Sequence, residues 1–202
     1  MIFDDIQRAG PISALQRWRR FQSGPRWLSW VWLWLVCGSL ATAGDTPAVT
    51  EYQVKAVYLF NFTKFTEWPA SAFPSADAPI VIGILGDDPF GATLDALIKG
   101  ESVRRHPLLI RRLQPGDNLQ GCQVLFFSRN LKEQLPALLQ PLQGIPILTV
   151  GDVSHFGEQG GMVNFVLVQE KVKLEINQAA AEAAGLQISA KLLRLATIVK
   201  TN

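Results

Sequence analysis

Hydrophobic residues recur at spacings of three and four along residues 51–66, a pattern that predicts a helix. The apolar side of this helix is expected to carry Val54, Val57, Tyr58, Asn61, Phe62 and Phe65. Glu51 and Lys55 are expected toward the opposite side. Further apolar residues widen the stripe, and a helix with so wide a stripe is usually buried on more than one side. Pro69 should end the segment, because the residue before a proline disfavours helical dihedral angles.

Short apolar runs without alternation follow at residues 80–85, 124–128 and 147–150, and such runs predict strands buried on both faces. Residues 106–113 predict a further strand. Helices are expected at 89–99 and 130–142, the first started by Asp88 with Pro89, and Pro136 is expected to kink the second or delay its start. Strands that alternate with helices in this order predict a mainly parallel sheet between two helical layers.

The pattern changes in the last third of the chain. Residues 162–168 and 171–176 predict two strands joined at Gln169 and Glu170, and the second strand alternates apolar with charged residues. Helices are expected at 177–184 and 189–199, separated by Gly185. The predicted fold class is therefore α/β, a three-layer αβα arrangement whose mainly parallel sheet gains an antiparallel edge from the C-terminal hairpin.

The first 43 residues differ in composition from the rest. They hold five of the six tryptophans, five arginines and an apolar run from Trp27 to Leu40, followed by the small residues Ala41-Thr42-Ala43. This order predicts a signal peptide over 1–43 cleaved near Ala43, a linker over 44–50 and an exported α/β domain over 51–202. The apolar run spans about 14 residues, short for a membrane-spanning helix, yet an uncleaved anchor stays open as the alternative. The long basic segment also leaves the true start codon open.

Removal of residues 1–43 leaves 14 basic and 15 acidic residues, so the positive charge of the whole chain belongs to the export segment. A nucleic-acid partner would call for clustered positive charge and is not expected. The remaining chain holds a single cysteine, Cys122, which is expected to be buried and has no internal disulfide partner.

Polar residues follow three of the predicted parallel strands, where ligand sites form in sheets of this class. They are Asp87 and Asp88 after the first strand, Ser128 and Arg129 after the next, and Asp152 after the third. If these loops converge, they predict a pocket for a small polar ligand or a divalent cation. The competing interpretation is that each loop only caps a helix or makes a turn.

Two further residues are candidate ligand contacts: His155, in a predicted loop over 153–161, and Asn164, which falls among apolar residues of a predicted strand. The chain contains no Gly-x-Ser-x-Gly elbow and no phosphate-binding glycine loop, and its histidines have no metal-ligand spacing. We therefore expect neither an enzyme nor a cofactor or metal, and no catalytic residue is assigned. A hydrolase that uses Asp88 or His155 is the weakest alternative.

Seven segments in order carry a resemblance to a known family: VKAVYLFNFTKFTEWP, ILGDDPFG at 84–91, GCQVLFFS at 121–128, ILTVGD at 147–152, GGMVNFV at 160–166, LEIN at 174–177 and AGLQISAKLLRLA at 184–196. Together they resemble the YfiR family of periplasmic regulators over roughly residues 50–200. The resemblance implies a three-layer α/β fold. YfiR itself carries several cysteines that pair, whereas this chain keeps only Cys122 after residue 43, so the disulfides of YfiR are not expected here.

The resemblance implies a regulatory binding protein. Its partner would be the periplasmic domain of an inner-membrane diguanylate cyclase, which the protein would repress, so that cyclic di-GMP and biofilm formation fall. An outer-membrane lipoprotein would titrate the repressor away. A homodimer is also expected, because one domain is not expected to cover the apolar opening helix fully. The alternative function is a periplasmic small-molecule sensor or carrier that uses the strand-end pocket.

Overall fold

The computed structural model describes residues 50–200 of the chain, and the signal peptide predicted at 1–43 lies outside the described residues. The elements in chain order are α1 (Glu51–Phe65), β1 (Thr66–Glu67), η1 (Ala70–Ala72), β2 (Ile80–Leu85), α2 (Ala92–Ile98), β3 (Ser102–Val103), β4 (His106–Leu113), β5 (Val124–Phe127), η2 (Arg129–Gln134), α3 (Leu135–Leu139), η3 (Gln140–Leu142), β6 (Leu148–Gly151), β7 (Val163–Val168), β8 (Lys171–Ile176), α4 (Gln178–Ala183), β9 (Gln187–Ile188), α5 (Ala190–Leu193) and β10 (Ala196–Ile198).

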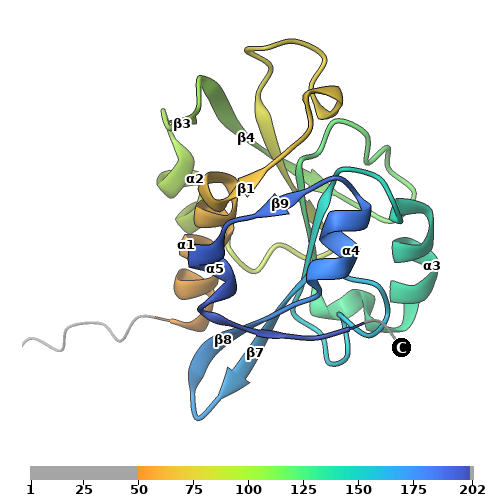
Figure 1. Cartoon of the computed structure of the whole chain (residues 1–202). Helices are drawn as coiled ribbons and strands as arrows, with labels where there is room; N and C mark the ends of the chain where they lie inside the picture. Colours follow the sequence, from red (N-terminus) through yellow and green to blue (C-terminus); the bar gives the residue numbers. More distant parts are fainter. Residues whose placement is uncertain (1–49, 201–202) are drawn as a thin grey trace, which may run out of the picture. The chain divides into compact units, whose positions relative to one another are not determined.

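An eight-stranded sheet in the order β10-β8-β7-β6-β5-β2-β4-β3 forms the centre of the fold (Figure 1). Strands β4, β2, β5, β6 and β7 run parallel, which confirms the mainly parallel sheet. Every residue of β2, β5 and β6 is buried, as their uninterrupted apolar runs predict. Helices cover both faces, so the αβα layering is confirmed.

Two hydrophobic cores lie on opposite faces of this sheet. The larger joins α1, α2, α4 and α5 through residues such as Leu59, Phe62, Leu94 and Leu192, whereas the smaller joins α3 and its flanking turns through Leu135 and Leu139. A separate two-stranded pair links distant parts of the chain, because Thr66 of β1 lies opposite Ile188 of β9. Within residues 50–200, no helix has the length and hydropathy that a membrane crossing requires.

The structure corrects the predicted face of α1. Lys55 is buried, together with Ala56, Leu59, Phe62 and Thr63, whereas Val57 is exposed. The apolar pattern alone placed Lys55 on the outer side, but burial follows the spacing of Lys55 with Leu59 and Phe62 along one line of the helix. An ionised lysine enters such a line only when a partner compensates its charge.

Two predicted helices begin later or are shorter in the structure. α2 begins at Ala92 rather than at Pro89, because the Asp88 carboxylate accepts from the backbone of Phe90 and Gly91 in a separate turn and Gly91 has a φ of +49°. The segment 130–142 is α-helical only over Leu135–Leu139, between two 3₁₀ turns. Pro136 stands at the start of α3, where its missing N–H costs nothing.

The prediction of a helix over 189–199 is wrong in its second half. Only Ala190–Leu193 is helical, and Ala196–Ile198 forms β10, which pairs in parallel with β8. The β-branched residues Thr197 and Ile198 favour this extended conformation. The predicted antiparallel hairpin of β7 and β8 is present, but it is not the edge of the sheet because β10 lies outside it.

Candidate functional site

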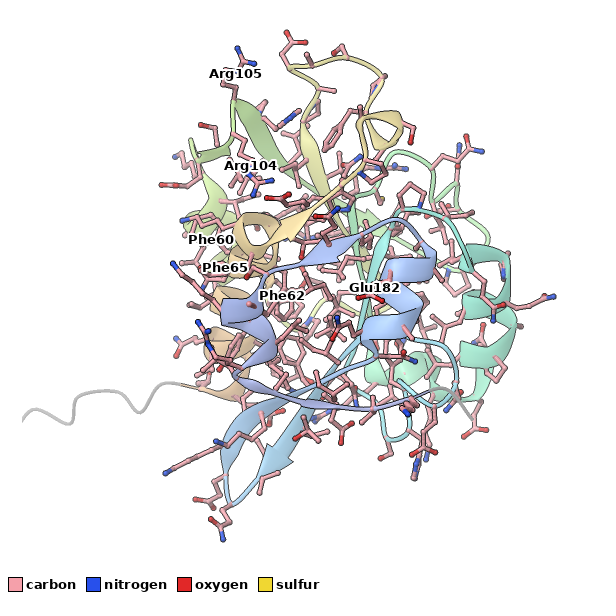
Figure 2. The ribbon with its side chains drawn as sticks, viewed as in Figure 1. Phe60, Phe62, Phe65, Arg104, Arg105 and Glu182 are labelled. Carbon is pink, nitrogen blue, oxygen red and sulfur yellow. The ribbon has the colours of Figure 1, made fainter. Side chains whose placement is uncertain are left out.

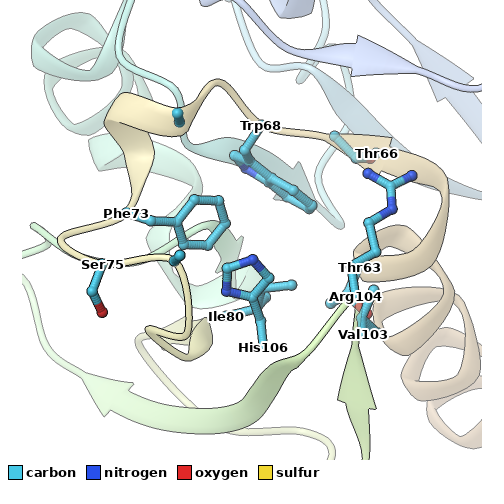
Figure 3. A pocket seen from close by; sticks show the side chains of 11 residues that line it. Thr63, Thr66, Trp68, Phe73, Ser75, Ile80, Val103, Arg104 and His106 are labelled. Atoms are coloured by element: carbon cyan, nitrogen blue, oxygen red, sulfur yellow. The ribbon is translucent and has the colours of Figure 1, made fainter.

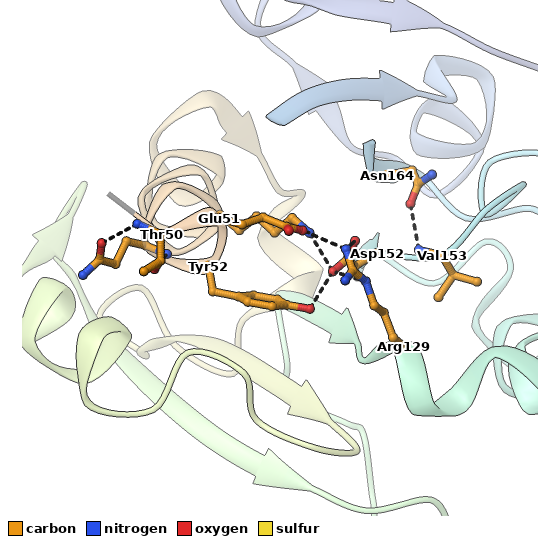
Figure 4. Close-up of polar contacts among 9 residues, drawn as sticks. Thr50, Glu51, Tyr52, Arg129, Asp152, Val153 and Asn164 are labelled. Atoms are coloured by element: carbon orange, nitrogen blue, oxygen red, sulfur yellow. Dashed lines mark hydrogen bonds and ion pairs between the residues drawn. The ribbon is translucent and has the colours of Figure 1, made fainter. Parts of the chain in front are cut away.

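Asp152 is the centre of a polar network at the carboxyl ends of the parallel strands (Figure 4). It follows β6, and its side chain is only 3% exposed. Arg129 follows the neighbouring strand β5 and approaches both carboxylate oxygens, with Nε 3.0 Å from Oδ2 and a terminal nitrogen 3.0 Å from Oδ1. Two of the three predicted loops therefore meet, as expected for adjacent parallel strands.

The first turn of α1 covers this pair from the opposite side. Lys55 places Nζ 2.7 Å from Oδ2 of Asp152 and also pairs with Glu51, one helical turn before it. Tyr52 donates its hydroxyl to the same Oδ2 at 3.0 Å, and Arg129 reaches Glu51 at 2.7 Å. Two cations and two carboxylates alternate, so the network compensates its own charge.

Local sequence fixes the start of α1 over the network. Thr50 caps the helix and forms a capping box with Gln53, in which each side chain accepts from the other residue's backbone N–H. The box sets the helical phase at Glu51, and it thereby brings Tyr52 and Lys55, three residues apart, onto the face toward Asp152. The rings of Tyr52 and Phe165 lie 4.8 and 5.6 Å from the Lys55 ammonium.

The contacts within the network shift the pKa values of Tyr52 and Glu51. Burial, reinforced by the charge and hydrogen bond of Asp152, raises the pKa of Tyr52 to about 12, so this hydroxyl stays protonated and donates. The pKa of Glu51 is lowered, chiefly by the hydrogen bond from Lys55 and also by the charges of Lys55 and Arg129, although burial opposes them. Chemically, the arrangement holds a helix on a sheet edge and leaves no deprotonated base at Tyr52.

Glu51 gives the first prediction. Because its pKa falls on folding, its contribution to stability is present above the usual value of 4.5 and is lost as the pH drops through the lower folded value. Glu51→Gln should therefore cost about 1 kcal/mol at neutral pH and almost nothing at acid pH. The measurement is the free energy of unfolding from urea titrations between about pH 3 and pH 7. A difference in unfolding free energy between the two proteins that stays constant down to the lowest pH would contradict a stabilising role of the ionised Glu51.

The remaining predicted residues do not join the network. Asp88 pairs with Arg112 of β4 at 2.8 Å, and Asp87 is exposed. Ser128 is buried at the start of η2, where its carbonyl accepts from the backbone of Leu131. Of the three predicted loops, the first thus uses its carboxylate for a turn and an ion pair, as the competing interpretation expects.

Arg129, Asp152 and Asn164 do line one hollow of about 450 Å³, and Asn164 and His155 line a neighbouring one of about 250 Å³. Asn164 is buried, accepts from the backbone of Val153 at 3.3 Å and donates to Glu175 at 3.3 Å. His155 is exposed, has a φ of +62° and contacts Glu158 at 3.1 Å. No group of metal-ligating side chains gathers among residues 50–200. Ligand binding by these residues stays a prediction.

Sequence reasoning missed Tyr52, Lys55 and Glu51 as partners of the strand ends. A signal was present, because Lys55 stands in line with Leu59 and Phe62, and Asp152 directly follows a short, mainly apolar strand. A lysine on the apolar side of a helix, together with an aspartate at the end of a buried strand, is the combination that predicts a buried ion pair between the helix and the sheet.

Comparison with known proteins comes from one family model, described as YfiR/HmsC-like, which matches residues 52–197. The match therefore includes α1 without its first residue, the sheet up to Thr197 of β10, and each of the predicted site residues. The search of curated proteins found no match.

Proposed function

The chain belongs to the YfiR/HmsC-like family, and on this premise we propose that it is a periplasmic regulator that represses an inner-membrane diguanylate cyclase by binding the periplasmic domain of that cyclase. Repression lowers cyclic di-GMP and biofilm formation, and an outer-membrane lipoprotein relieves it by sequestering the regulator. The single observation that carries the proposal is the family match over residues 52–197, almost the whole domain. Residues 1–43 serve as the cleaved export signal in this proposal.

The geometry of the strand ends supports a role in binding rather than in chemistry. In this fold class catalytic groups gather at the carboxyl ends of the strands. Here Lys55, Arg129 and Tyr52 all direct their polar atoms at the Asp152 carboxylate. Groups held in such mutual contacts stabilise a surface, and a stable surface is what a repressor that acts by complex formation requires.

The β7–β8 hairpin is the surface that we propose for the cyclase contact. It projects from the body of the domain (Figure 1), and Leu167 and Val168 near its tip are about half exposed. Gln169 and Glu170 form its turn with positive φ values, a conformation that matches the twist of a two-residue hairpin. Exposed apolar side chains on a projecting, well-formed element suit insertion into a partner, because their burial on binding is favourable.

The test is the cellular level of cyclic di-GMP in a strain that lacks the gene. We expect the level to rise, to return with the intact gene, and to stay high with a gene that lacks codons 1–43, since repression requires export. Leu167→Asp should also fail to restore the low level, whereas Leu109→Asp, at a residue of similar exposure on β4 (51% against 53%), should restore it. An unchanged level on deletion, under conditions in which the protein is made, would sink the proposal. Equal restoration by both variants would place the contact elsewhere.

A small-molecule sensor is the second candidate, and the hollow beside Arg129 favours it. That hollow has about 450 Å³ and brings Arg129, Asp152 and Asn164 to one wall. A metabolite that fills it should raise the melting temperature by linkage, and Arg129→Gln should abolish the rise. A panel of small polar metabolites that produces no shift in the intact protein counts against this function.

A further inference from the structure

A separate pocket, of about 480 Å³, lies at the other end of α1 from the Asp152 network. Its walls come from the last turn of α1, the segment after β1, and the amino ends of β2 and β4. Figure 3 shows Trp68, Phe73 and His106 around the opening, with Thr66 and Arg104 on the side opposite Phe73. We call it the aromatic pocket. It shares no residue with the strand-end hollows.

The walls of the aromatic pocket are flat and held in place. The rings of Phe73 and His106 are stacked, with centroids 4.4 Å apart and planes inclined by 22°. The indole nitrogen of Trp68 donates to the backbone carbonyl of Gln123 at 3.0 Å, which fixes the third ring. Ile80 and Val103 complete the apolar lining. Such walls favour a planar aromatic ligand, because offset stacking adds to the gain from burying apolar surface.

One hydroxyl in the wall lacks a partner. Thr66 is 1% exposed, and its Oγ1 is the one buried side-chain polar atom within residues 50–200 that makes no hydrogen bond. Buried polar groups are nearly always paired, since an unpaired one costs free energy. On the opposite wall, His106 donates from Nδ1 to the carbonyl of Ala78 at 2.6 Å, which fixes its ring. The hydroxyl of Thr66 is thus the polar group of the wall that is left for a ligand.

A cation stands at the rim. Arg104 and Arg105 form the turn between β3 and β4 with φ values of +50° and +76°, a region that residues other than glycine rarely adopt (Figure 2). Arg104 lines the pocket and pairs with Glu67 at 2.7 Å, but both side chains are more than half exposed, so the pair is weak. These φ values are those of a two-residue hairpin turn, and the turn places the Arg104 guanidinium beside the pocket.

We propose that the aromatic pocket binds a small planar aromatic carboxylate. The ring of the ligand lies between Trp68 and the Phe73–His106 stack, and its carboxylate replaces Glu67 as the partner of Arg104. Thr66 is closed to solvent in the absence of ligand, and its hydroxyl donates to the carboxylate once Arg104 has turned from Glu67 toward the ligand. Each feature of the pocket is then used: the flat walls, the orphan hydroxyl and the arginine. The proposal is independent of cyclase repression, since it concerns only binding by the purified chain.

Benzoate is the probe, measured by isothermal titration calorimetry with the full chain. We expect saturable binding at about one site with a dissociation constant of about a millimolar or tighter, a usual affinity for so few atoms. Benzyl alcohol, which lacks the charge, should bind at least about tenfold more weakly. Arg104→Gln should weaken benzoate binding by about tenfold or more, and Thr66→Val by about fivefold. Thr66→Val should not lower the melting temperature, because it removes an unpaired hydroxyl.

Arg105→Gln is the matched control, because Arg105 shares the turn and the positive φ of Arg104 but points away from the domain and does not line the pocket. Its affinity for benzoate should stay within about twofold of the original protein. Absence of saturable binding up to about 20 mM benzoate would overturn the proposal. Binding that Arg104→Gln and Thr66→Val both leave unchanged would overturn it equally, because the benzoate would then lie elsewhere on the protein.

Discussion

Replacement of Asp152 by alanine is expected to lower the free energy of unfolding by about 3–5 kcal/mol, the cost of breaking one side of a buried ion pair. Lys55 is 1% exposed, so when the Asp152 carboxylate is removed its ammonium keeps only the pair with Glu51 and gains no compensating contact with water. Arg129 and Tyr52 lose the same acceptor. Urea titration of the purified variant measures the loss, with the melting temperature as a second readout.

Two variants make this result specific. Asp87→Ala removes a carboxylate from an exposed position in the loop after β2 and should change the free energy of unfolding by less than about 0.5 kcal/mol. The double variant Lys55→Met with Asp152→Leu removes both buried charges, and it should recover at least half of the loss. A cost of less than about 1 kcal/mol for Asp152→Ala would show that the network does not hold α1 on the sheet.

Gly161→Ala is expected to cost about 3 kcal/mol, the upper part of the range for overpacking. A Cβ atom at this position would lie 2.2 Å from two ring carbons of Phe156, whose side chain is fully buried. The ring has no room to retreat, because on its other side a Cβ at Gly151 would lie 2.4 Å from it. Two glycines thus form a slot for one phenylalanine ring, and thermal and urea unfolding both measure the expected loss.

Replacement of Phe156 by a smaller side chain provides the control for this slot. Phe156→Leu alone creates a cavity and should cost about 1–3 kcal/mol. In combination with Gly161→Ala the leucine makes room for the added methyl group, so the double variant should lose less than the two single losses together. Strict additivity would contradict the slot, because it would mean that the methyl group and the ring do not meet.

The parts of the fold that follow from local physics were predictable. The strands β2 and β5 are continuous apolar runs and β6 is one except for Thr149, and runs of this length between turn residues favour buried strands. The hairpin of β7 and β8 follows from alternation on either side of Gln169 and Glu170. Asn177 caps the helix after β8, because its side chain accepts from the backbone N–H of Ala180. Cys122 is buried, as its place beside an apolar run predicts.

The predictions that were wrong concern residues whose conformation or burial depends on a partner elsewhere in the chain. β10 forms because β8 offers an open edge to Ala196–Ile198, which no local pattern reveals. Lys55 is buried because it pairs with Asp152, which lies nearly a hundred residues later in the chain. Helical periodicity cannot reveal such a partner, because it assigns every lysine to the solvent side. Asp88 combined with Pro89 is a strong start signal for a helix, yet the side chain makes a separate turn and pairs with Arg112. Arg129 and Asp152 were placed together correctly because strand ends bring neighbours together whatever their partners are.

The pairing of β1 with β9 has a consequence for the time at which the domain can be completed. Thr66 meets Ile188, so an early and a late segment of the folded domain pair with each other. Contacts between residues so far apart in sequence make folding slow, because much chain entropy is lost before they form. A polypeptide that emerges from its N-terminus onward cannot form the β1–β9 pair until residues 187–188 are free. The first helix therefore waits for a segment more than a hundred residues later, whereas the loss of Ala196–Ile198 would leave β8 without its outer neighbour and the β1–β9 pair intact.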